Sequence, residues 1–155
     1  NLFLAILISI PAINLFTHGT HITVAHSMGT TIGINTLILL SSIGYLLESV
    51  MHYQENSKKI IAIGMKIFNT SFFGFWIILI VMGIQKSKWQ YFTENILFTT
   101  FQDSMHYFYI AFAVFGFGLL IGLFVVIFQF LKQIYAILAS DIFKNEESEN
   151  EINLS

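Results

Sequence analysis

The chain has 155 residues, of which 55% are hydrophobic and only 10% are charged, whereas a soluble domain carries about 25% charged residues. This composition excludes a typical water-soluble globular protein. Seven lysines, no arginine and nine acidic residues give a net charge of −2, so no basic patch for nucleic acid can form and nucleic acid is excluded as a partner. The chain has no cysteine, so a metal site would have to use His, Met, Asp or Glu.

Four apolar segments indicate an all-α integral membrane helix bundle of about three complete transmembrane helices and a truncated first one. The first segment is shorter than the roughly 20 residues that a bilayer core requires, and Pro11 would kink or end it. The chain begins at Asn1 inside this apolar run, without the features of a signal peptide, so we expect a C-terminal fragment of a longer protein. The expected spans are residues 2–16, 22–47, 60–84 and 105–138.

The polar segments predict the orientation of the bundle. A polar loop is expected from Glu48 to Lys59, and a headgroup-level stretch with aromatic residues from Gln85 to Ser104. The acidic tail, residues 139–155, is expected to be disordered and cytoplasmic, because it carries like charges and few apolar residues. Lysines are more frequent on the side of the tail, with four on that side (Lys58, Lys59, Lys132 and Lys144) and two on the other (Lys86 and Lys88).

The most informative stretch is 17–35, THGTHITVAHSMGTTIGIN, which holds three histidines within nine residues at the start of the second span. Polar groups at membrane depth are costly, so this half of the span is expected to face protein or a cofactor instead of lipid. Haem iron suits such a site best, because His and Met are its usual axial ligands and apolar walls accommodate the porphyrin. A zinc site is less natural here.

Helical geometry separates the candidate ligands His18, His21, His26 and Met28. His26 and Met28 are two residues apart, about 200° around a helix, so they point to nearly opposite faces and one helix could serve two cofactors. His21 and Met28 share a face, but at ~10 Å along the axis they cannot bind one metal ion. His18 precedes the helix and is expected to meet water, a haem propionate or a carbonyl. The alternatives are a hydrogen-bonded core histidine and a packing methionine.

Other residues of the spans have structural interpretations. Gly29 and Gly33 permit close approach of a helix or a macrocycle, and the small-residue face of Gly118 and Gly122 predicts helix packing. Lys66 can extend its stem to the headgroups or serve a proton path. The segment 69–71, Asn-Thr-Ser, indicates interhelical hydrogen bonding.

The motif THGT, followed six residues later by an intramembrane histidine and seven residues beyond that by Gly33, resembles the tenth helix of the large subunit of respiratory nitric oxide reductases. These belong to the haem–copper oxidase superfamily. In that family the helix carries His-x-His, whose first histidine binds the high-spin haem and whose second binds the low-spin haem b. Here the first position is His26 and the second is Met28. The segment 74–76, Gly-Phe-Trp, is similar to a weaker motif of the eleventh helix.

The resemblance implies that the chain contains the last helices of a subunit I fold, in a bacterial inner membrane with a cytoplasmic C-terminus. The activity it implies is the reduction of nitric oxide to nitrous oxide, with low-spin and high-spin haem b as cofactors. The ligands of a non-haem iron would lie outside the chain, so no catalytic residue is assigned within it. The partners it implies are the upstream helices, membrane lipid and an electron donor such as a cytochrome c subunit or quinol. The alternatives are subunit I of an oxygen-reducing haem–copper oxidase and a haem-free bundle, such as an anchor or a transporter fragment.

Overall fold

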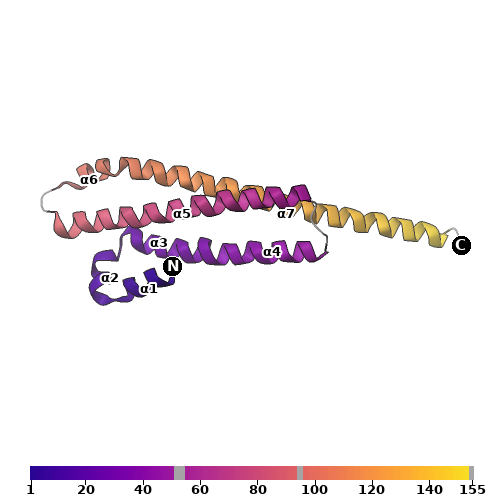
Figure 1. Ribbon diagram of the computed structural model, residues 1–155, viewed down its shortest axis with the longest axis horizontal. Helices are drawn as coiled ribbons and strands as arrows, with labels where there is room; N and C mark the ends of the chain where they lie inside the picture. The colour runs from indigo at the N-terminus through magenta and orange to yellow at the C-terminus, as the bar shows by residue number, and fades with distance from the viewer. Residues whose placement is uncertain (51–54, 94–95, 154–155) are drawn as a thin grey trace.

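A computed structural model describes residues 1–50, 55–93 and 96–153, and in these residues every regular element is a helix. The elements in chain order (Figure 1) are α1 (Leu2–Ser9), α2 (Pro11–Thr17), α3 (His21–Thr30), the π-helix η1 (Thr31–Thr36), α4 (Leu37–Val50), α5 (Glu55–Phe92), α6 (Phe98–Ser104) and α7 (His106–Asn153).

Three helices are long and apolar enough to cross a membrane: His21–Val50, Asn56–Phe92 and His106–Ala139. They agree with the expected spans at 22–47, 60–84 and 105–138, and the prediction of an all-α membrane helix bundle is confirmed. In Figure 1, α5 lies between α3 and the first part of α7, and further along the bundle α7 crosses α5 and packs against α4. In chain order, α4 and α5 form one helical hairpin, and α5 and α7 form a second.

The first apolar segment is divided in two, as Pro11 predicts. Ile10 is extended (φ −72°, ψ 122°) between α1 and α2, with Pro11 in the first turn of α2. A residue before proline is pushed out of the α-helical region, and proline is favoured at a helix start. The segment 2–16 therefore forms two short helices that turn beside α3 (Figure 1).

Glycines bring α5 and α7 into close contact. A Cβ atom at Gly122 would lie 2.5 Å from the backbone nitrogen of Phe68, and one at Gly64 would lie 2.9 Å from Val126. Phe68 and Val126 are fully buried at this crossing. The prediction that Gly118 and Gly122 serve helix packing is confirmed, since a side chain at Gly118 would collide with Ser71.

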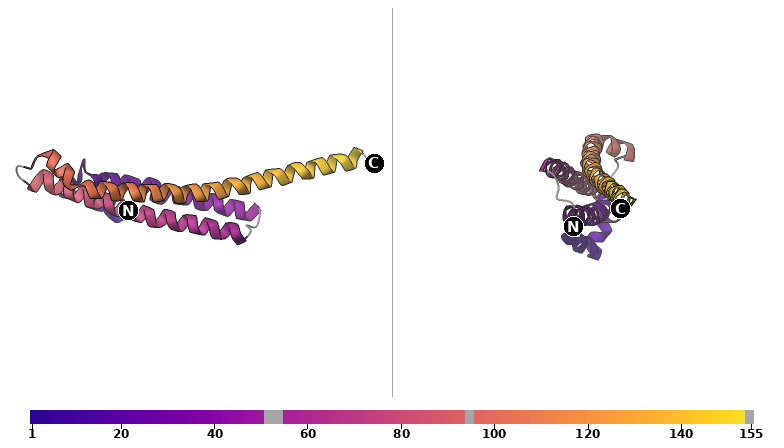
Figure 2. Two further views of the ribbon diagram at one scale, coloured as in Figure 1. Left: turned by 90° about the horizontal axis from the view of Figure 1, so that it is seen from above. Right: turned by 90° about the vertical axis from the view of Figure 1, so that its right-hand side faces the viewer.

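Helices extend further than the polarity of the sequence indicates. The expected polar stretch from Gln85 begins inside α5, which continues to Phe92. The prediction of a disordered tail is wrong for the backbone, because α7 continues to Asn153 and extends past the other helices (Figure 2). No glycine or proline follows Gly122, and the tail contains residues of good helix propensity, so nothing in it ends the helix. In the expected loop at 48–59, residues 51–54 lie outside the described part, and helix occupies both sides of them.

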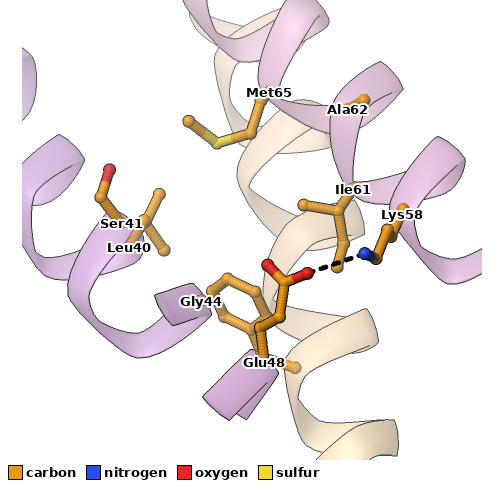
Figure 3. A pocket seen from close by; sticks show the side chains of 9 residues that line it. Leu40, Ser41, Gly44, Glu48, Lys58, Ile61, Ala62 and Met65 are labelled. Atoms are coloured by element: carbon orange, nitrogen blue, oxygen red, sulfur yellow. Dashed lines mark hydrogen bonds and ion pairs between the residues drawn. The ribbon is translucent and has the colours of Figure 1, made fainter. Parts of the chain in front are cut away.

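At the end of the bundle where α4 meets α5, the helices leave a pocket of about 280 Å³ (Figure 3). Its walls are mainly apolar and include Leu40, Met65 and Phe130. At its rim, the Lys58 Nζ atom lies 2.7 Å from the Glu48 carboxylate. This pocket lies between α4, α5 and α7, at the opposite end of the α3–η1–α4 helix from the three histidines of residues 17–35.

Candidate functional site

The THGT turn, residues 17–20, is built by its own side chains. The Thr20 hydroxyl caps α3 by accepting a hydrogen bond from the Ile22 N–H (3.2 Å) and donates to the Thr17 carbonyl (2.7 Å). The Thr23 hydroxyl donates to the same carbonyl (3.1 Å). Gly19 has φ +71°, a conformation that side-chain-bearing residues rarely adopt. This part of the resembled motif therefore has a clear structural role.

Side chains near the C-terminal end of α5 form hydrogen bonds with the THGT turn and with α2 before it. The Lys86 ammonium donates to the Gly19 carbonyl (2.9 Å), and the Tyr91 hydroxyl donates to the Leu15 carbonyl (2.7 Å). The Phe16 ring meets the Tyr91 ring edge-on, with centroids 5.0 Å apart. These contacts need the helical extension of α5 beyond residue 84, so the end of α5 fixes where α3 begins.

His26 lies on α3, half-buried, beside the side chain of Asn1. The Asn1 amide nitrogen donates to the His26 carbonyl (3.1 Å) and to the Thr30 hydroxyl (2.6 Å). The Thr30 hydroxyl in turn donates to the His26 carbonyl (3.1 Å). The amide oxygen of Asn1 faces the His26 Nδ1 atom at 3.3 Å.

This network determines the tautomer of a neutral His26. The amide nitrogen of Asn1 is identified by its two acceptors, because a backbone carbonyl cannot donate and the Thr30 proton is directed to His26. The oxygen opposite Nδ1 can only accept, so Nδ1 must carry the proton and Nε2 keeps the lone pair. Metal-binding histidines show this arrangement, with one ring nitrogen on the metal and the other donating to an oxygen. Nε2 of His26 is therefore the ring nitrogen that could bind a metal ion.

Met28 has different surroundings from His26. It is partly buried and packs against the cluster of Ala25, Phe75 and Leu79, between α3 and α5. In this arrangement it acts as a core side chain, and its role as an axial ligand stays a prediction.

The other two histidines lie at the outer end of α3. His18 is exposed at the end of α2, as expected for a residue outside the helix. His21 begins α3, and its Nδ1 atom is buried with no hydrogen-bond partner among the described residues. Neither is in the Asn1 network around His26.

The motif at 74–76 joins this site through Trp76. The Trp76 indole N–H donates to the Ala25 carbonyl (3.0 Å). Gly29 allows this approach, because a Cβ there would lie 3.0 Å from the indole nitrogen and 2.7 Å from the Asn1 amide oxygen. A Cβ at Gly33 would lie 2.8 Å from the Phe72 ring. The space beside both glycines is therefore filled by protein side chains, those of Asn1 and Trp76 at Gly29 and that of Phe72 at Gly33.

Sequence reasoning missed the π-helix η1, which follows α3 directly. The Thr36 hydroxyl donates to the Thr31 carbonyl (3.0 Å), five residues earlier, which matches the wider turn. Along α3 and η1, Ser27, Thr31 and Asn35 are exposed at spacings of four residues and form one polar stripe. Single π-turns in helices often mark functional sites. The clustered threonines and glycines at 29–36 were the available signal.

Comparison with known proteins yields no match, either to a protein family, to a curated protein or to a solved structure. Across the described residues, no three His, Asp or Glu side chains gather closely enough to hold a metal ion together.

Proposed function

We propose that this chain is part of a haem-containing membrane reductase that converts nitric oxide to nitrous oxide, with His26 as the axial ligand of the high-spin haem. The observation that carries the proposal is the Asn1–His26 contact, which leaves Nε2 of a membrane-embedded histidine with a free lone pair. The resemblance of the THGT turn and of the histidine six residues after it to the nitric oxide reductase family supports the same residue.

The reaction of the whole enzyme combines two NO molecules, two electrons and two protons into N2O and water. Haem iron supplies a binding site for NO and one-electron chemistry at that site. The residues of this chain hold and orient the ligand: Asn1 fixes the tautomer of His26, and the capped turn fixes the start of its helix. Low-spin haem b, a non-haem iron bound by residues outside the chain, and a cytochrome c or quinol donor complete the proposal.

The polar stripe of Ser27, Thr31 and Asn35 supports the presence of further protein or cofactor beside α3. A row of polar side chains facing lipid would be costly, and α5 occupies another side of the helix, at Ala25 and Gly29. We further propose a bacterial inner membrane and a cytoplasmic C-terminus, supported by the distribution of lysines between the two ends of the bundle.

The proposal is tested with His26→Ala in the full-length protein. We expect loss of the high-spin haem, of carbon monoxide binding to the reduced protein and of NO reduction. The matched control is His106→Ala, since His106 is exposed at the start of α7 and is in contact with Tyr107, and its replacement should preserve all three. Normal carbon monoxide binding by His26→Ala would contradict the assignment of His26 as the haem ligand. If the unmodified full-length protein reduces oxygen but not NO, the proposed substrate is wrong.

A further inference from the structure

One face of α5 carries three exposed polar residues at membrane depth: Lys66, Asn69 and Thr70, called here the polar face of α5. The apolar stretch of α5 runs from residue 60 to 84, so its middle is residue 72. At 1.5 Å per residue, Asn69 and Thr70 lie within about 5 Å of the middle and Lys66 about 9 Å from it. The half-thickness of a bilayer core is about 15 Å, so all three backbone positions lie inside the hydrocarbon region.

None of these three side chains makes a hydrogen bond to any residue that the structure describes. By contrast, the hydroxyl groups of Ser9, Thr17 and Ser42 each donate to the carbonyl four residues earlier. Lys66 could reach the headgroups with its long stem, but the side chains of Asn69 and Thr70 are too short to do so. Polar groups inside a membrane are directed to protein or to water-filled cavities, so the polar face of α5 is not a lipid-facing surface.

The shape of this face suits a second helix. Two hollows of about 440 and 400 Å³ flank Lys66, one bordered by Ala62 and Asn69 and the other by Ile67 and Thr70. Ala62 is small and exposed, which lets another backbone approach closely. Side chains of a neighbouring helix can enter the hollows on both sides of Lys66.

We propose that the polar face of α5 binds a transmembrane helix that carries an Asp or Glu level with Lys66 and hydrogen-bonds to Asn69. Charge complementarity identifies the partner, because a helix packed over Asn69 and Thr70 also covers Lys66, and an ammonium group covered in this way is stabilised by a carboxylate. A second copy of this chain cannot supply that group from its spans, since residues 1–47, 56–93 and 104–140 contain no Asp or Glu. The carboxylate therefore comes from a helix outside these segments.

The first experiment places a nitroxide spin label at Asn69→Cys in the full-length protein in native membranes, with any cysteines outside this chain replaced. This chain itself has no cysteine that would compete for the label. The matched control is Phe124→Cys on α7, because Phe124 is 69% exposed among apolar neighbours. We expect an immobilised label with low accessibility to oxygen at position 69 and a mobile, oxygen-accessible label at 124. Thr70→Cys replaces Asn69→Cys if that variant does not assemble.

The second experiment tests the partner's chemistry with a membrane-permeant carbodiimide, which activates carboxyl groups so that a neighbouring amine forms an amide. Peptide mass spectrometry should find Lys66 joined to an Asp or Glu of a transmembrane segment, and Lys66→Gln should abolish the product. A label at 69 as mobile and oxygen-accessible as the control would overturn the interface. An immobilised label without a Lys66 cross-link would overturn the acidic partner.

Discussion

Replacing Asn1 by leucine tests whether the Asn1 amide prepares His26 for iron. Leucine has a similar size but cannot accept the Nδ1 proton or donate to the His26 carbonyl and the Thr30 hydroxyl, so the contacts at 3.3, 3.1 and 2.6 Å are lost. Loss of such a supporting hydrogen bond lowers metal affinity by roughly 10- to 100-fold. Because 3.3 Å is long for an N–H···O bond, we expect the lower end, about tenfold or ~1.4 kcal/mol.

The assay is haem retention and the iron–histidine stretching frequency of the reduced full-length protein, measured by resonance Raman spectroscopy. Asn1→Leu should lower both, because a histidine without its acceptor is a weaker donor to iron. Asn1→Asp places a stronger acceptor at Nδ1 and should raise the frequency and lower the midpoint potential. Asn14→Leu is the control, since Asn14 is exposed on α2. An unchanged frequency in both Asn1 variants would refute the role given to this amide.

Three further predictions concern packing, the second ligand and the tail. Gly122→Ala should destabilise the protein by about 1–3 kcal/mol, because its Cβ would lie 2.5 Å from the α5 backbone, whereas Gly116→Ala makes only a 3.7 Å contact and should keep the melting temperature in detergent. If Met28 binds the low-spin haem, Met28→Leu should leave that haem five-coordinate or lost, and Met28→His should keep a low-spin spectrum with a lower midpoint potential. An unaltered spectrum in Met28→Leu would move the search to His21. Truncation before Asp141 should preserve haem content and turnover, and loss of assembly would show that the tail contacts a partner.

The parts of the fold that follow from local chemistry could be predicted from the sequence. Long segments of mainly apolar residues indicate spans whatever surrounds them, and Pro11 interrupts a helix through its own ring and its effect on Ile10. Gly118 and Gly122 indicate a packed face because only small residues allow backbones to approach closely. Each of these inferences depends on one segment alone.

The parts that depend on pairs of distant segments could not be predicted. The contact between Asn1 and His26 joins residues 25 positions apart, and that between Trp76 and the Ala25 carbonyl joins residues 51 apart. No periodicity within one helix encodes such pairs. The helical ends of α5 and α7 were missed for another reason, because polarity was taken as a sign of loop or disorder although charged residues are compatible with helix.

The contacts around His26 show how the polar half of the second span is held in place by other segments of the protein. The carbonyls of Ala25 and His26 receive hydrogen bonds from Trp76 of α5 and from Asn1, which precedes α1, so two segments other than α3 fix this turn. Rotating α3 would break both contacts and would press Gly29 against its neighbours. Immediately afterwards, η1 widens the helix and contributes Thr31 and Asn35 to the exposed polar stripe. The proposed iron ligand needs a rigid support before iron binds, and the contacts of Asn1 and Trp76 hold the backbone on both sides of the Ala25–His26 peptide bond.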